Sequence, residues 1–330
     1  MTKYRKLVVT GHLGFIGSAF CWNYRDSYTL VGVDFAGWGS MKENLAPGVR
    51  DVRIDIAEAD DVRALLDEVK PDAIVNFAAE SHVDRAVDQD LPFWRSNVMG
   101  ARNLAIEAQQ RGLRLVQVST DEVYGDATEA TEAWTERSPM APRNPYSVTK
   151  TAAEMMLLAY ENTYGLDVVI TRGANTIGPR QFPEKAVPKA VNHFLRGSPF
   201  PLFRTPARRM WLYVDDHASG VEAALRKGRK GEAYNIAPGI KSEAYTHEVI
   251  AMVKEQVGNG EIEEVDDRKG YDLRYWMSAE KAQKELEWAP EHDLRSTVQH
   301  SVNWYLKNKE WLGKAGAQLR EASGEPTVSG

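Results

Sequence analysis

Short apolar runs alternate with longer amphipathic runs through the first half of the chain. Each apolar run is five to seven residues long, which suits a buried strand better than a helix. We expect strands at residues 6–10, 30–34, 50–56, 73–77, 113–119 and 167–172, and helices at residues 14–24, 60–70, 97–111 and 145–164. Strands that alternate with helices form a parallel sheet with right-handed crossovers and helices on both faces. The first half therefore predicts an α/β fold with a doubly wound parallel sheet.

The strand–helix rhythm ends after residue 172. Proline and glycine become frequent between residues 178 and 206, and only short periodic pieces return, near residues 211–214, 233–236, 245–256 and 278–286. We therefore expect a first domain at residues 1–172 and a smaller, irregular α/β substrate-binding lobe at residues 173–313. Strands near residues 211–217 and 233–238 are expected to rejoin the main sheet. The polar stretch at residues 314–330 is predicted to be a flexible tail.

The composition is that of an ordinary globular protein, with 43% hydrophobic and 27% charged residues among 330. The net charge of −6 argues against nucleic acid or an anionic membrane as a partner. A single cysteine, Cys21, excludes an internal disulfide and a cysteine-rich metal cluster, so we expect a buried, inert thiol and no metal. No run approaches the roughly 20 apolar residues of a membrane span, and no signal peptide is evident, so a cytoplasmic location is expected.

Three glycines follow the first expected strand at the spacing G-x-x-G-x-x-G. Gly11 allows a tight turn, Gly14 lets the backbone approach a pyrophosphate, and Gly17 lets the following helix pack closely. The helix N-terminus then offers N–H groups and a positive dipole end to phosphates. Asp34, at the end of the second strand, can accept hydrogen bonds from a ribose and would repel a 2′-phosphate. These features predict a Rossmann-type domain that binds NAD rather than NADP, and His12 is expected to face solvent rather than contact a phosphate.

Tyr146 and Lys150 lie four residues apart near the start of the expected helix 145–164, so they share one helical face. A lysine ammonium beside a phenol lowers the pKa of the phenol because it favours the phenolate. Such a phenolate can remove a proton from a hydroxyl while the adjacent carbon gives a hydride to nicotinamide. Lys150 can also hold the nicotinamide ribose. The pair therefore predicts the oxidation of an alcohol.

Two adjacent carboxylates, Asp121 and Glu122, follow the expected strand 113–119. Ligands lie at the carboxyl ends of strands in open parallel sheets. Eliminating water requires one acid to protonate the leaving hydroxyl and one carboxylate to take a proton from carbon, whereas plain redox chemistry requires neither. Close carboxylates in unlike surroundings have pKa values pushed apart, which permits this division. The pair therefore favours a dehydratase, with two helix-capping acids as the structural alternative.

Several sequence runs resemble those of one enzyme family. The runs extend over about residues 6–290 and are TGHLGFIGS, PDAIVNFAAESHVDRAV, VSTDEVYG, NPYSVTKTAAE, TRGANTIGPRQFPEKAVP, WLYVDDH and GEAYNIAP. Together they are similar to the extended short-chain dehydrogenase/reductases, the NAD-dependent epimerase/dehydratase superfamily. AAESHVDR, STDEVYG and QFPEK carry a narrower resemblance, to the dTDP-glucose 4,6-dehydratases.

This resemblance implies a complete reaction on a nucleotide-diphosphate sugar with bound NAD as cofactor. Thr120 would hold the sugar C4 hydroxyl, and Tyr146 would remove its proton while the cofactor takes the C4 hydride. The resulting ketone acidifies the C5 proton, which Glu122 would remove, while Asp121 would protonate the C6 hydroxyl so that it leaves as water. Return of the hydride to C6 would give a 4-keto-6-deoxy sugar and regenerate the cofactor. The implied enzyme is a hydro-lyase.

The resemblance also implies which other residues contact the two ligands. The implied cofactor contacts are Gly11, Gly14, Phe15, Ile16, Gly17, Asp34, Asp55, Ile56, Phe77, Ala78, Ala79, Asn97, Ser119, Tyr146 and Lys150. The implied substrate contacts are Ser81, His82, Asn175, Glu184, Lys185, Arg209 and Arg274. Relatives pair as homodimers through helices that match residues 97–111 and 145–164, which implies the same partner for this chain.

The chain departs from the family pattern at the glycine turn and in the second half. His12 and Leu13 replace the usual Gly-Ala, and both side chains must therefore point away from the cofactor. The other departures fall at residues 176–179, 203–206, 209–211 and 271–274. They leave the catalytic residues intact, but they leave the nucleotide base and the hexose open. Arg204, Arg208 and Arg209 together suggest a rearranged pocket for the diphosphate or the base.

Other activities are compatible with parts of this pattern. A 4-epimerase or a decarboxylase of the same superfamily also oxidises C4, but neither needs the adjacent Asp121 and Glu122. A 5,6-dehydratase that stops at the exocyclic alkene would use the same elimination residues. A regulator that only binds NAD(H) would be expected to lack the tyrosine, the lysine or the acids, and all of these are present.

Overall fold

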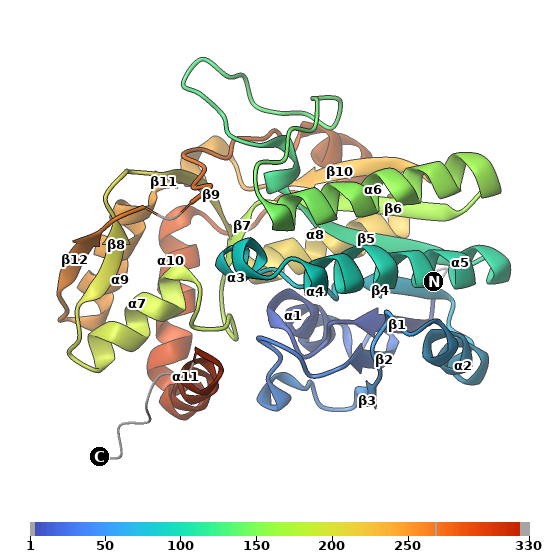
Figure 1. Cartoon of the computed structure of the whole chain (residues 1–330), viewed down its shortest axis with the longest axis horizontal. Coiled ribbons are helices and arrows are strands. Elements are labelled where there is room, and N and C mark those ends of the chain that lie inside the picture. Colours follow the sequence, from blue (N-terminus) through green and yellow to red (C-terminus); the bar gives the residue numbers. More distant parts are fainter. Residues whose placement is uncertain (1–3, 268, 324–330) are drawn as a thin grey trace.

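Seven parallel strands form the central sheet, in the order β10-β6-β5-β4-β1-β2-β3 (Figure 1). The strands are β1 Lys6–Thr10, β2 Thr29–Asp34, β3 Arg50–Arg53, β4 Ala73–Asn76, β5 Arg114–Thr120, β6 Asp167–Gly173 and β10 Glu232–Ile236. The structure is a computed structural model that describes residues 4–267 and 269–323. All six strands expected in the first half are present, and the doubly wound α/β fold is confirmed.

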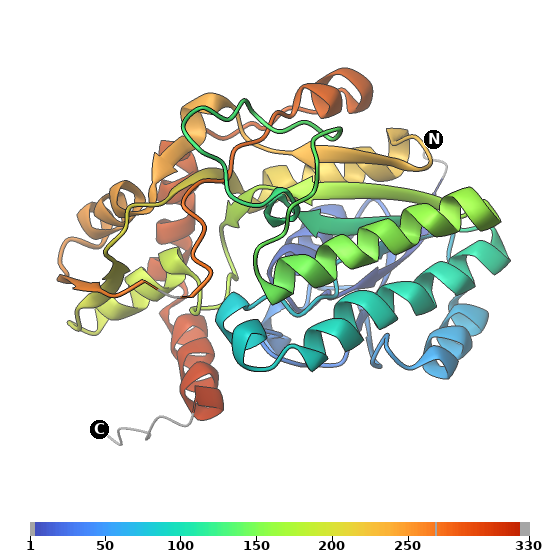
Figure 2. The same cartoon turned by 45° about the horizontal axis from the view of Figure 1, so that its top comes forward.

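Helices cover both faces of this sheet. One face carries α1 (Phe15–Tyr24) and α8 (Val214–Lys227), and the other carries α2 (Ala59–Val69), α5 (Ala101–Arg111) and α6 (Pro145–Tyr164). Helices α5 and α6 run side by side (Figures 1 and 2). In β1, Leu7 and Val9 enter the core beneath α1, whereas Val8 enters the core beneath α2. This double burial explains why the strands are continuous apolar runs.

Short helical segments connect the longer elements. They are α3 (Val83–Asp88), α4 (Leu91–Phe93) and η2 (Trp94–Gly100), which lead into α5, and the turns η1 (Lys42–Asn44), η3 (Asp121–Tyr124), η4 (Ile240–Ser242) and η5 (Ala282–Leu286). The helix expected from residue 97 therefore starts earlier, and residues 94–100 form a π-helical stretch rather than a regular α-helix. The helix expected at residues 278–286 is present at residues 280–286, of which residues 282–286 form the π-helical stretch η5.

The smaller lobe is built around two small sheets. One sheet has the order β11-β9-β7, and the other pairs β8 with β12. The strands are β7 Asn175–Ile177, β8 Phe200–Phe203, β9 Arg208–Tyr213, β11 Glu243–Tyr245 and β12 Ile262–Val265, and the helices are α7 Ala186–Leu195, α9 Thr246–Val257, α10 Leu294–Lys307 and α11 Lys309–Ser323. Trp211, Phe194, Val249 and Tyr305, from four of these elements, share one hydrophobic core. The lobe therefore has a core of its own beside the main sheet.

One of the two strands expected to rejoin the main sheet does so. β10 pairs with β6 at the sheet edge, as expected for residues 233–238. The strand expected at residues 211–217 instead forms β9, which pairs with β7 and β11 in the lobe, and the chain turns into α8 at Val214. That expectation was wrong because an apolar run reports burial but not which sheet a strand joins.

The expected tail at residues 314–330 is also corrected. Helix α11 continues to Ser323. Its residues Trp311, Leu312 and Ala315 are buried in the lobe core, and the indole N–H of Trp311 donates to the Asn44 side-chain oxygen at 2.9 Å. This packing orders a segment whose small and polar residues suggested a tail. Residues 324–330 lie outside the described residues.

Cys21 is buried in α1, as expected, and burial raises the pKa of its thiol to about 12. A thiol in this environment stays protonated and unreactive at neutral pH. Within residues 4–267 and 269–323, no helix is long and apolar enough to cross a membrane. The same described residues contain no group of three or more His, Cys, Asp or Glu that could hold a metal ion.

Candidate active site

A cavity lies at the carboxyl ends of β1, β2, β4 and β5, where the main sheet meets residues 181–185 of the lobe. Its empty space is about 1200 Å³ and opens to solvent. Most of the expected cofactor contacts line it: Gly11, Gly14, Phe15, Ile16, Gly17, Asp34, Ile56, Phe77, Ala78, Ala79, Ser119, Tyr146 and Lys150. Three expected substrate contacts, Ser81, Glu184 and Lys185, line it as well. The fold therefore gathers residues from distant parts of the sequence at one site.

The glycine turn between β1 and α1 tolerates no side chains at two of its positions. Gly11 has a φ of +70°, and a Cβ there would lie 2.7 Å from the backbone nitrogen of Ala78. At Gly17 a Cβ would lie 2.2 Å from the carbonyl oxygen of Gly11. The N-cap of α1 is Gly14, so no side chain caps the N–H groups of its first turn. A turn this tight beside an uncapped helix N-terminus fits the pyrophosphate of a dinucleotide.

Asp34 ends β2 with its carboxylate at the cavity wall. One carboxylate oxygen accepts hydrogen bonds from the N–H of Ala36 at 2.8 Å and from the hydroxyl of Ser40 at 2.9 Å. The other oxygen accepts from the N–H of Leu13 at 3.2 Å. These donors fix the position of a negative charge at the cavity. That charge suits a ribose with free hydroxyls and disfavours a 2′-phosphate, so the residues present fit NAD.

His12 is buried rather than exposed, which corrects the expectation from the sequence. Its Nε2 lies 3.0 Å from a carboxylate oxygen of Asp51, and its ring fills the space beside Gly32, where a Cβ would come within 2.3 Å of the imidazole. Burial lowers the pKa of His12. Leu13 is fully buried too, and neither residue lines the cavity. Both side chains therefore point away from the cofactor site, as the departure from the family pattern required.

Tyr146 and Lys150 both reach the cavity from the first turns of α6. The helix is well defined there because Pro145 opens it and Asn144 and Ser147 form a reciprocal capping box. The ammonium of Lys150 donates to the backbone oxygen of Val118 at 2.7 Å, which ties α6 to the end of β5. Burial lowers the pKa of Lys150 to about 8. The pair thus faces the site from a rigid element.

The pKa of Tyr146 differs from the expectation. Burial raises it, and the negative charge of Glu122 acts in the same direction, while a hydrogen bond with Thr120 acts against both. Lys150 does not lower this pKa, because its ammonium is bonded to Val118 rather than to the phenol. Positive charge close to the phenol is therefore required before Tyr146 can act as a base near neutrality.

Asp121 and Glu122 open the turn η3 directly after β5, in two different environments. Asp121 is buried and accepts a hydrogen bond from Thr120 at 3.1 Å. Burial and the charge of Glu122 raise the pKa of Asp121 to about 7. Glu122 is more exposed, and one of its oxygens accepts from the side-chain N–H of Asn144 at 2.9 Å. One acid is therefore suited to carry a proton near neutrality while its neighbour is held by an N–H donor.

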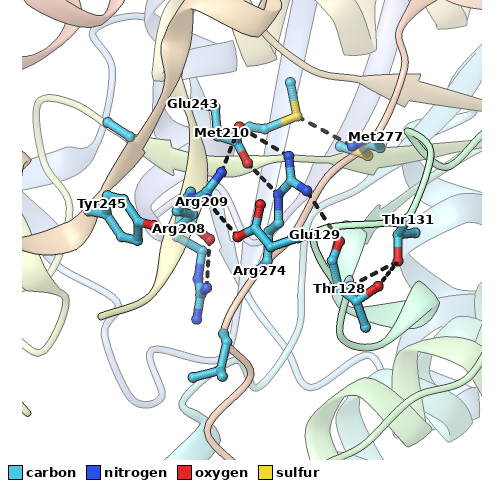
Figure 3. A network of polar contacts seen from close by, with 12 residues as sticks. Thr128, Glu129, Thr131, Arg208, Arg209, Met210, Glu243, Tyr245, Arg274 and Met277 are labelled. Atoms are coloured by element: carbon cyan, nitrogen blue, oxygen red, sulfur yellow. Dashed lines mark hydrogen bonds and ion pairs between the residues drawn. The ribbon is translucent and has the colours of Figure 1, made fainter. Parts of the chain in front are cut away.

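Arg209 and Arg274, two of the expected substrate contacts, lie in the lobe (Figure 3), outside the cavity lining. Arg209 is 7% exposed, donates to the backbone oxygen of Asp272 at 2.6 Å and lies 4.4 Å over the ring of Tyr275. Its positive charge acts on Asp121, which places it near the acids. Arg274 pairs with Glu243 at 2.6 Å. Both arginines are therefore held in defined positions, and Arg209 lies close enough to Asp121 for its charge to act on that acid.

The suggestion that Arg204, Arg208 and Arg209 form one rearranged pocket is only partly supported. Arg208 joins the same cluster, since it pairs with Glu129 and lies 3.9 Å from Glu243 (Figure 3). Arg204 lies apart, 65% exposed and paired with Asp266 at 3.1 Å. A pocket around the diphosphate would therefore be formed by Arg208, Arg209 and Arg274, without Arg204.

A second cavity of about 400 Å³ adjoins this arginine cluster. It is lined by Leu202, Phe203, Arg204, Thr205, Pro206, Ala207, Thr246, His247, Glu264 and Tyr271. The rings of Phe203 and Tyr271 meet edge to face, with centroids 4.9 Å apart. Arg209 lies 5.8 Å from the Tyr271 ring, so this arginine stands between the second cavity and the acids.

Some expected contacts have other roles. Asn97 lies outside the cavity lining, and its side chain is used by hydrogen bonds with Glu80 and Thr149. Asp55 accepts from the N–H of Ala57 and pairs with Arg95, and only its neighbour Ile56 lines the cavity. Asn175 starts β7 outside the lining.

Beside the cavity, residues of the first domain contact residues of the lobe. His82 lies 3.5 Å from Glu184, and the Lys185 ammonium donates to the backbone oxygen of Ser81 at 3.0 Å. Trp38, which the sequence analysis missed, also lines the cavity and donates its indole N–H to Glu184. The sequence signal that could have found it is a tryptophan inside the glycine-rich loop AGWGS, because a large aromatic side chain in a loop usually packs against a neighbouring surface. Phe182 packs against it with centroids 6.0 Å apart.

The fold and the site together define the protein as a dinucleotide-binding protein equipped for acid–base chemistry on an alcohol. The model of the NAD dependent epimerase/dehydratase family matches residues 7–237, and the chain belongs to this family. The resemblance inferred from the sequence runs is therefore confirmed.

Individual relatives separate the dehydratases from the epimerases. A dTDP-glucose 4,6-dehydratase of Streptomyces griseus is 38% identical, over 92% of this chain and 95% of the relative. A crystal structure of dTDP-glucose 4,6-dehydratase from Bacillus anthracis in complex with NAD has a TM-score of 0.86 and 36% identity, and covers 94% of this chain and 99% of that chain. A UDP-glucose 4-epimerase from Thermus thermophilus in complex with NAD also has a TM-score of 0.86 but 28% identity, covering 92% and 99%. Sequence identity, unlike the fold, thus favours the dehydratases.

Proposed function

We propose that this protein is an NAD-dependent 4,6-dehydratase that converts dTDP-glucose, or a similar nucleotide-diphosphate hexose, to the 4-keto-6-deoxy sugar. The observation that carries the proposal is the adjacent pair Asp121 and Glu122 beside Tyr146, with the pKa of Asp121 raised to about 7. An epimerase needs no such pair. The dehydratases of Streptomyces griseus and Bacillus anthracis support the same reaction.

The first cavity is the proposed NAD site. Gly11, Gly14 and Gly17 would hold the pyrophosphate, Asp34 the adenosine ribose and Lys150 the nicotinamide ribose. When bound, NAD would supply a hydride acceptor for sugar C4 and then a hydride donor for C6, and its positive nicotinamide would supply the charge that a Tyr146 phenolate needs, since a nearby cation lowers the pKa of a phenol.

The protein's own groups move the protons. Tyr146 takes the proton of the C4 hydroxyl. Thr120, whose side chain hydrogen-bonds with the Tyr146 phenol, holds that hydroxyl in place. Glu122 then removes the C5 proton, made acidic by the new C4 ketone, with one oxygen held by Asn144. Asp121, protonated below about pH 7, gives its proton to the C6 hydroxyl so that water leaves. The two acids thereby perform opposite transfers on neighbouring carbons.

The lobe at residues 173–313, without α8 and β10 but with α11, is the proposed nucleotide-sugar domain, and residues 1–172 with α8 and β10 are the proposed cofactor domain. Arg208, Arg209 and Arg274 would hold the diphosphate, and Ser81, His82, Asn175, Glu184 and Lys185 would lie along the path of the substrate. The second cavity, between Phe203 and Tyr271, would take the nucleoside. This arrangement supports a sugar that reaches Tyr146 past Arg209.

A second copy of this chain is the proposed partner. Six large apolar side chains are exposed on α3, α4, η2 and α6: Val87, Leu91, Trp94, Met99, Val148 and Met155. These four elements pack against one another, and monomers rarely expose large contiguous apolar patches, so this surface supports a homodimer built from the side that carries η2 and α6. Sedimentation should give twice the chain mass, and Met155→Glu should shift the protein toward the monomer; a wild-type monomer would contradict the proposal.

The reaction is tested by incubating the purified protein with dTDP-glucose and measuring the product mass. The proposal expects a loss of one water, with no net consumption of NAD. UDP-, CDP- and GDP-glucose in parallel would establish the base. A product of unchanged mass with an inverted C4 hydroxyl would indicate an epimerase instead. A 5,6-alkene with the hydride returned to C4 would indicate a 5,6-dehydratase; it has the same mass as the 4-keto-6-deoxy sugar, so proton NMR must show whether C6 is a methyl group.

A further inference from the structure

A chain of buried polar side chains lies behind the active site and takes part in none of the steps above. Tyr124 ends the turn η3 that carries the two acids, Arg172 lies on β6, and Glu154 lies on α6 four residues after Lys150. The three side chains belong to residues at most 2% exposed. Buried charged groups are rare unless they are paired, so these three buried side chains require a specific explanation.

Arg172 connects the other two through charge-assisted hydrogen bonds. Its Nε and Nη2 donate to the same oxygen of Glu154 at 2.9 and 2.7 Å, and its Nη1 donates to the Tyr124 hydroxyl at 2.7 Å. The Tyr124 hydroxyl in turn donates to the side-chain oxygen of Asn235 at 2.7 Å. The Tyr124 ring stacks on Trp134 with centroids 5.4 Å apart. Tyr124 is therefore fixed both through its ring face and through its hydroxyl.

The hydrogen bonds of Arg172 to Glu154 and Tyr124, called the connection below, join the two segments that perform different parts of the proposed reaction. Tyr146 and Lys150 act from α6, whereas Asp121 and Glu122 act from η3, and both pairs must meet the same sugar. A misplacement of about 1 Å can cost about 10²-fold in rate. Tyr124 comes two residues after Glu122, so an error in its position passes directly to the acids.

Stability alone does not account for the ion pair at this place. Replacing a buried ion pair by apolar residues of similar size is often neutral or stabilising, so such a pair is weak evidence for a stabilising role. Its directional bonds do specify one arrangement of α6, β6 and η3. Helix α6 is also held by its capping box and by Lys150 on Val118, whereas η3 is a single turn. The turn therefore depends on the connection more than the helix does.

We propose that Tyr124, Arg172 and Glu154 are positioning residues that hold the acids of η3 in place relative to Tyr146, so that their loss slows elimination more than oxidation. This inference rests on the proposed function. It assigns no contact with substrate or cofactor to these three residues. A merely structural role would instead lower stability and slow both steps alike.

Tyr124→Phe tests the proposal, because it keeps the ring and its stacking on Trp134 and removes only the hydroxyl. The NAD-loaded protein is mixed rapidly with dTDP-glucose. Near-ultraviolet absorbance of the reduced nicotinamide follows oxidation at C4, and mass spectrometry of solvent deuterium at C5 follows removal of the C5 proton. We expect deuterium incorporation to slow at least ~10-fold. Cofactor reduction should keep its wild-type rate, so that reduced cofactor accumulates.

Tyr28→Phe is the matched control. Tyr28 is also a buried tyrosine, 4% exposed, whose hydroxyl donates to one partner, Glu222, at 2.7 Å, but it lies under the other face of the sheet. It should leave both steps unchanged. The double variant Glu154→Met with Arg172→Met removes the ion pair without leaving a lone charge, and should reproduce the Tyr124→Phe result.

The outcomes separate this inference from the function on which it rests. If Tyr124→Phe slows both steps by one common factor, or lowers the melting temperature with neither step changed, the positioning role is wrong and the proposed function stands. If the wild-type protein reduces no cofactor with dTDP-glucose or the other nucleotide sugars, the proposed function fails and the inference fails with it.

Discussion

The carboxyl-terminal edge of the main sheet, where its central strands end, and the lobe hold their functional side chains by different means. Below, the sheet edge means this carboxyl-terminal edge. At the sheet edge, Thr120 is the last residue of β5 and Asp121 comes directly after it, and Lys150 is tied to the backbone of Val118. In the lobe, Arg274 is held by Glu243 and Arg208 by Glu129 (Figure 3). Backbone anchors fix positions closely, whereas a carboxylate partner can be exchanged for a phosphate of the same charge.

This difference in anchoring matches the two tasks proposed for these groups, proton transfer at the sheet edge and substrate binding in the lobe. Groups that move protons must keep their distance from the sugar through several steps, and the ends of central strands provide that rigidity. Groups that bind a diphosphate must release it after each turnover. Substitutions at the sheet edge should therefore change rates, and substitutions in the lobe should change apparent affinity for the substrate.

Glu122→Gln should have the largest effect. The amide can still accept the hydrogen bond from Asn144 but cannot take the C5 proton, so the rate of dehydration should fall by about 10²–10⁴-fold. Product mass measures dehydration, and calorimetry with NAD should give the wild-type affinity. Glu161→Gln, at the far end of α6, serves as the control and should dehydrate normally. Full turnover by Glu122→Gln would remove this residue from the mechanism.

Arg209→Met tests the lobe. If the buried, hydrogen-bonded charge of Arg209 holds the substrate diphosphate as proposed, its loss should cost about 2–5 kcal/mol, so KM for the nucleotide sugar should rise much more than kcat falls. Arg50→Met is the comparison, because Arg50 lines neither cavity, its pair with Glu68 is exposed on both sides, and such pairs contribute about 0–1 kcal/mol. Initial rates across a substrate series give both constants. Equal effects of the two substitutions would mean that burial does not distinguish these arginines.

Asp121→Asn examines the cost of the raised pKa at the sheet edge. The folded protein favours the neutral acid, since the pKa rises from 3.8 to about 7 on folding. The stability contributed by Asp121 is therefore complete below pH 3.8 and is lost as pH rises toward about 7. Asparagine does not titrate and therefore lacks this loss. The melting temperature of Asp121→Asn should rise relative to that of the wild type as the pH increases from 3.8 to about 7. A melting-temperature difference that is constant with pH would contradict the raised pKa.

The same two regions differ in how far the sequence predicts them. The cofactor side of the sheet edge depends on local features, namely the glycine spacing and the positions of Asp34, Tyr146 and Lys150, so it could be predicted. The strand at residues 211–217 could not be assigned to a sheet, because pairing with β7 and β11 depends on segments far away in sequence. The ion pairs of Arg208 and Arg274 are equally non-local.

Errors at single residues have the same cause. A histidine in a turn suggests exposure, but Gly32 on the adjacent strand leaves a space that the His12 ring fills, and Asp51 provides a charged neighbour. The expected effect of Lys150 on Tyr146 assumed that a shared helical face means contact. Instead, the ammonium reaches the backbone of Val118. Spacing along a helix determines direction, whereas the partner depends on the packed neighbours.

Gly313→Ala should give the smallest effect, and it tests the corrected end of the lobe. Gly313 lies exposed inside α11, where an added Cβ meets nothing within 4 Å. Alanine is favoured over glycine inside a helix, so the free energy of unfolding should rise by roughly 0.5–1 kcal/mol. Gly48→Ala is the matched control: its Cβ also meets nothing within 4 Å, but its φ is +81°, so it should destabilise. Both substitutions add one methyl group to open space, so opposite signs in chemical denaturation can come only from backbone conformation. If Gly313→Ala changes nothing, the residues after it form a tail after all.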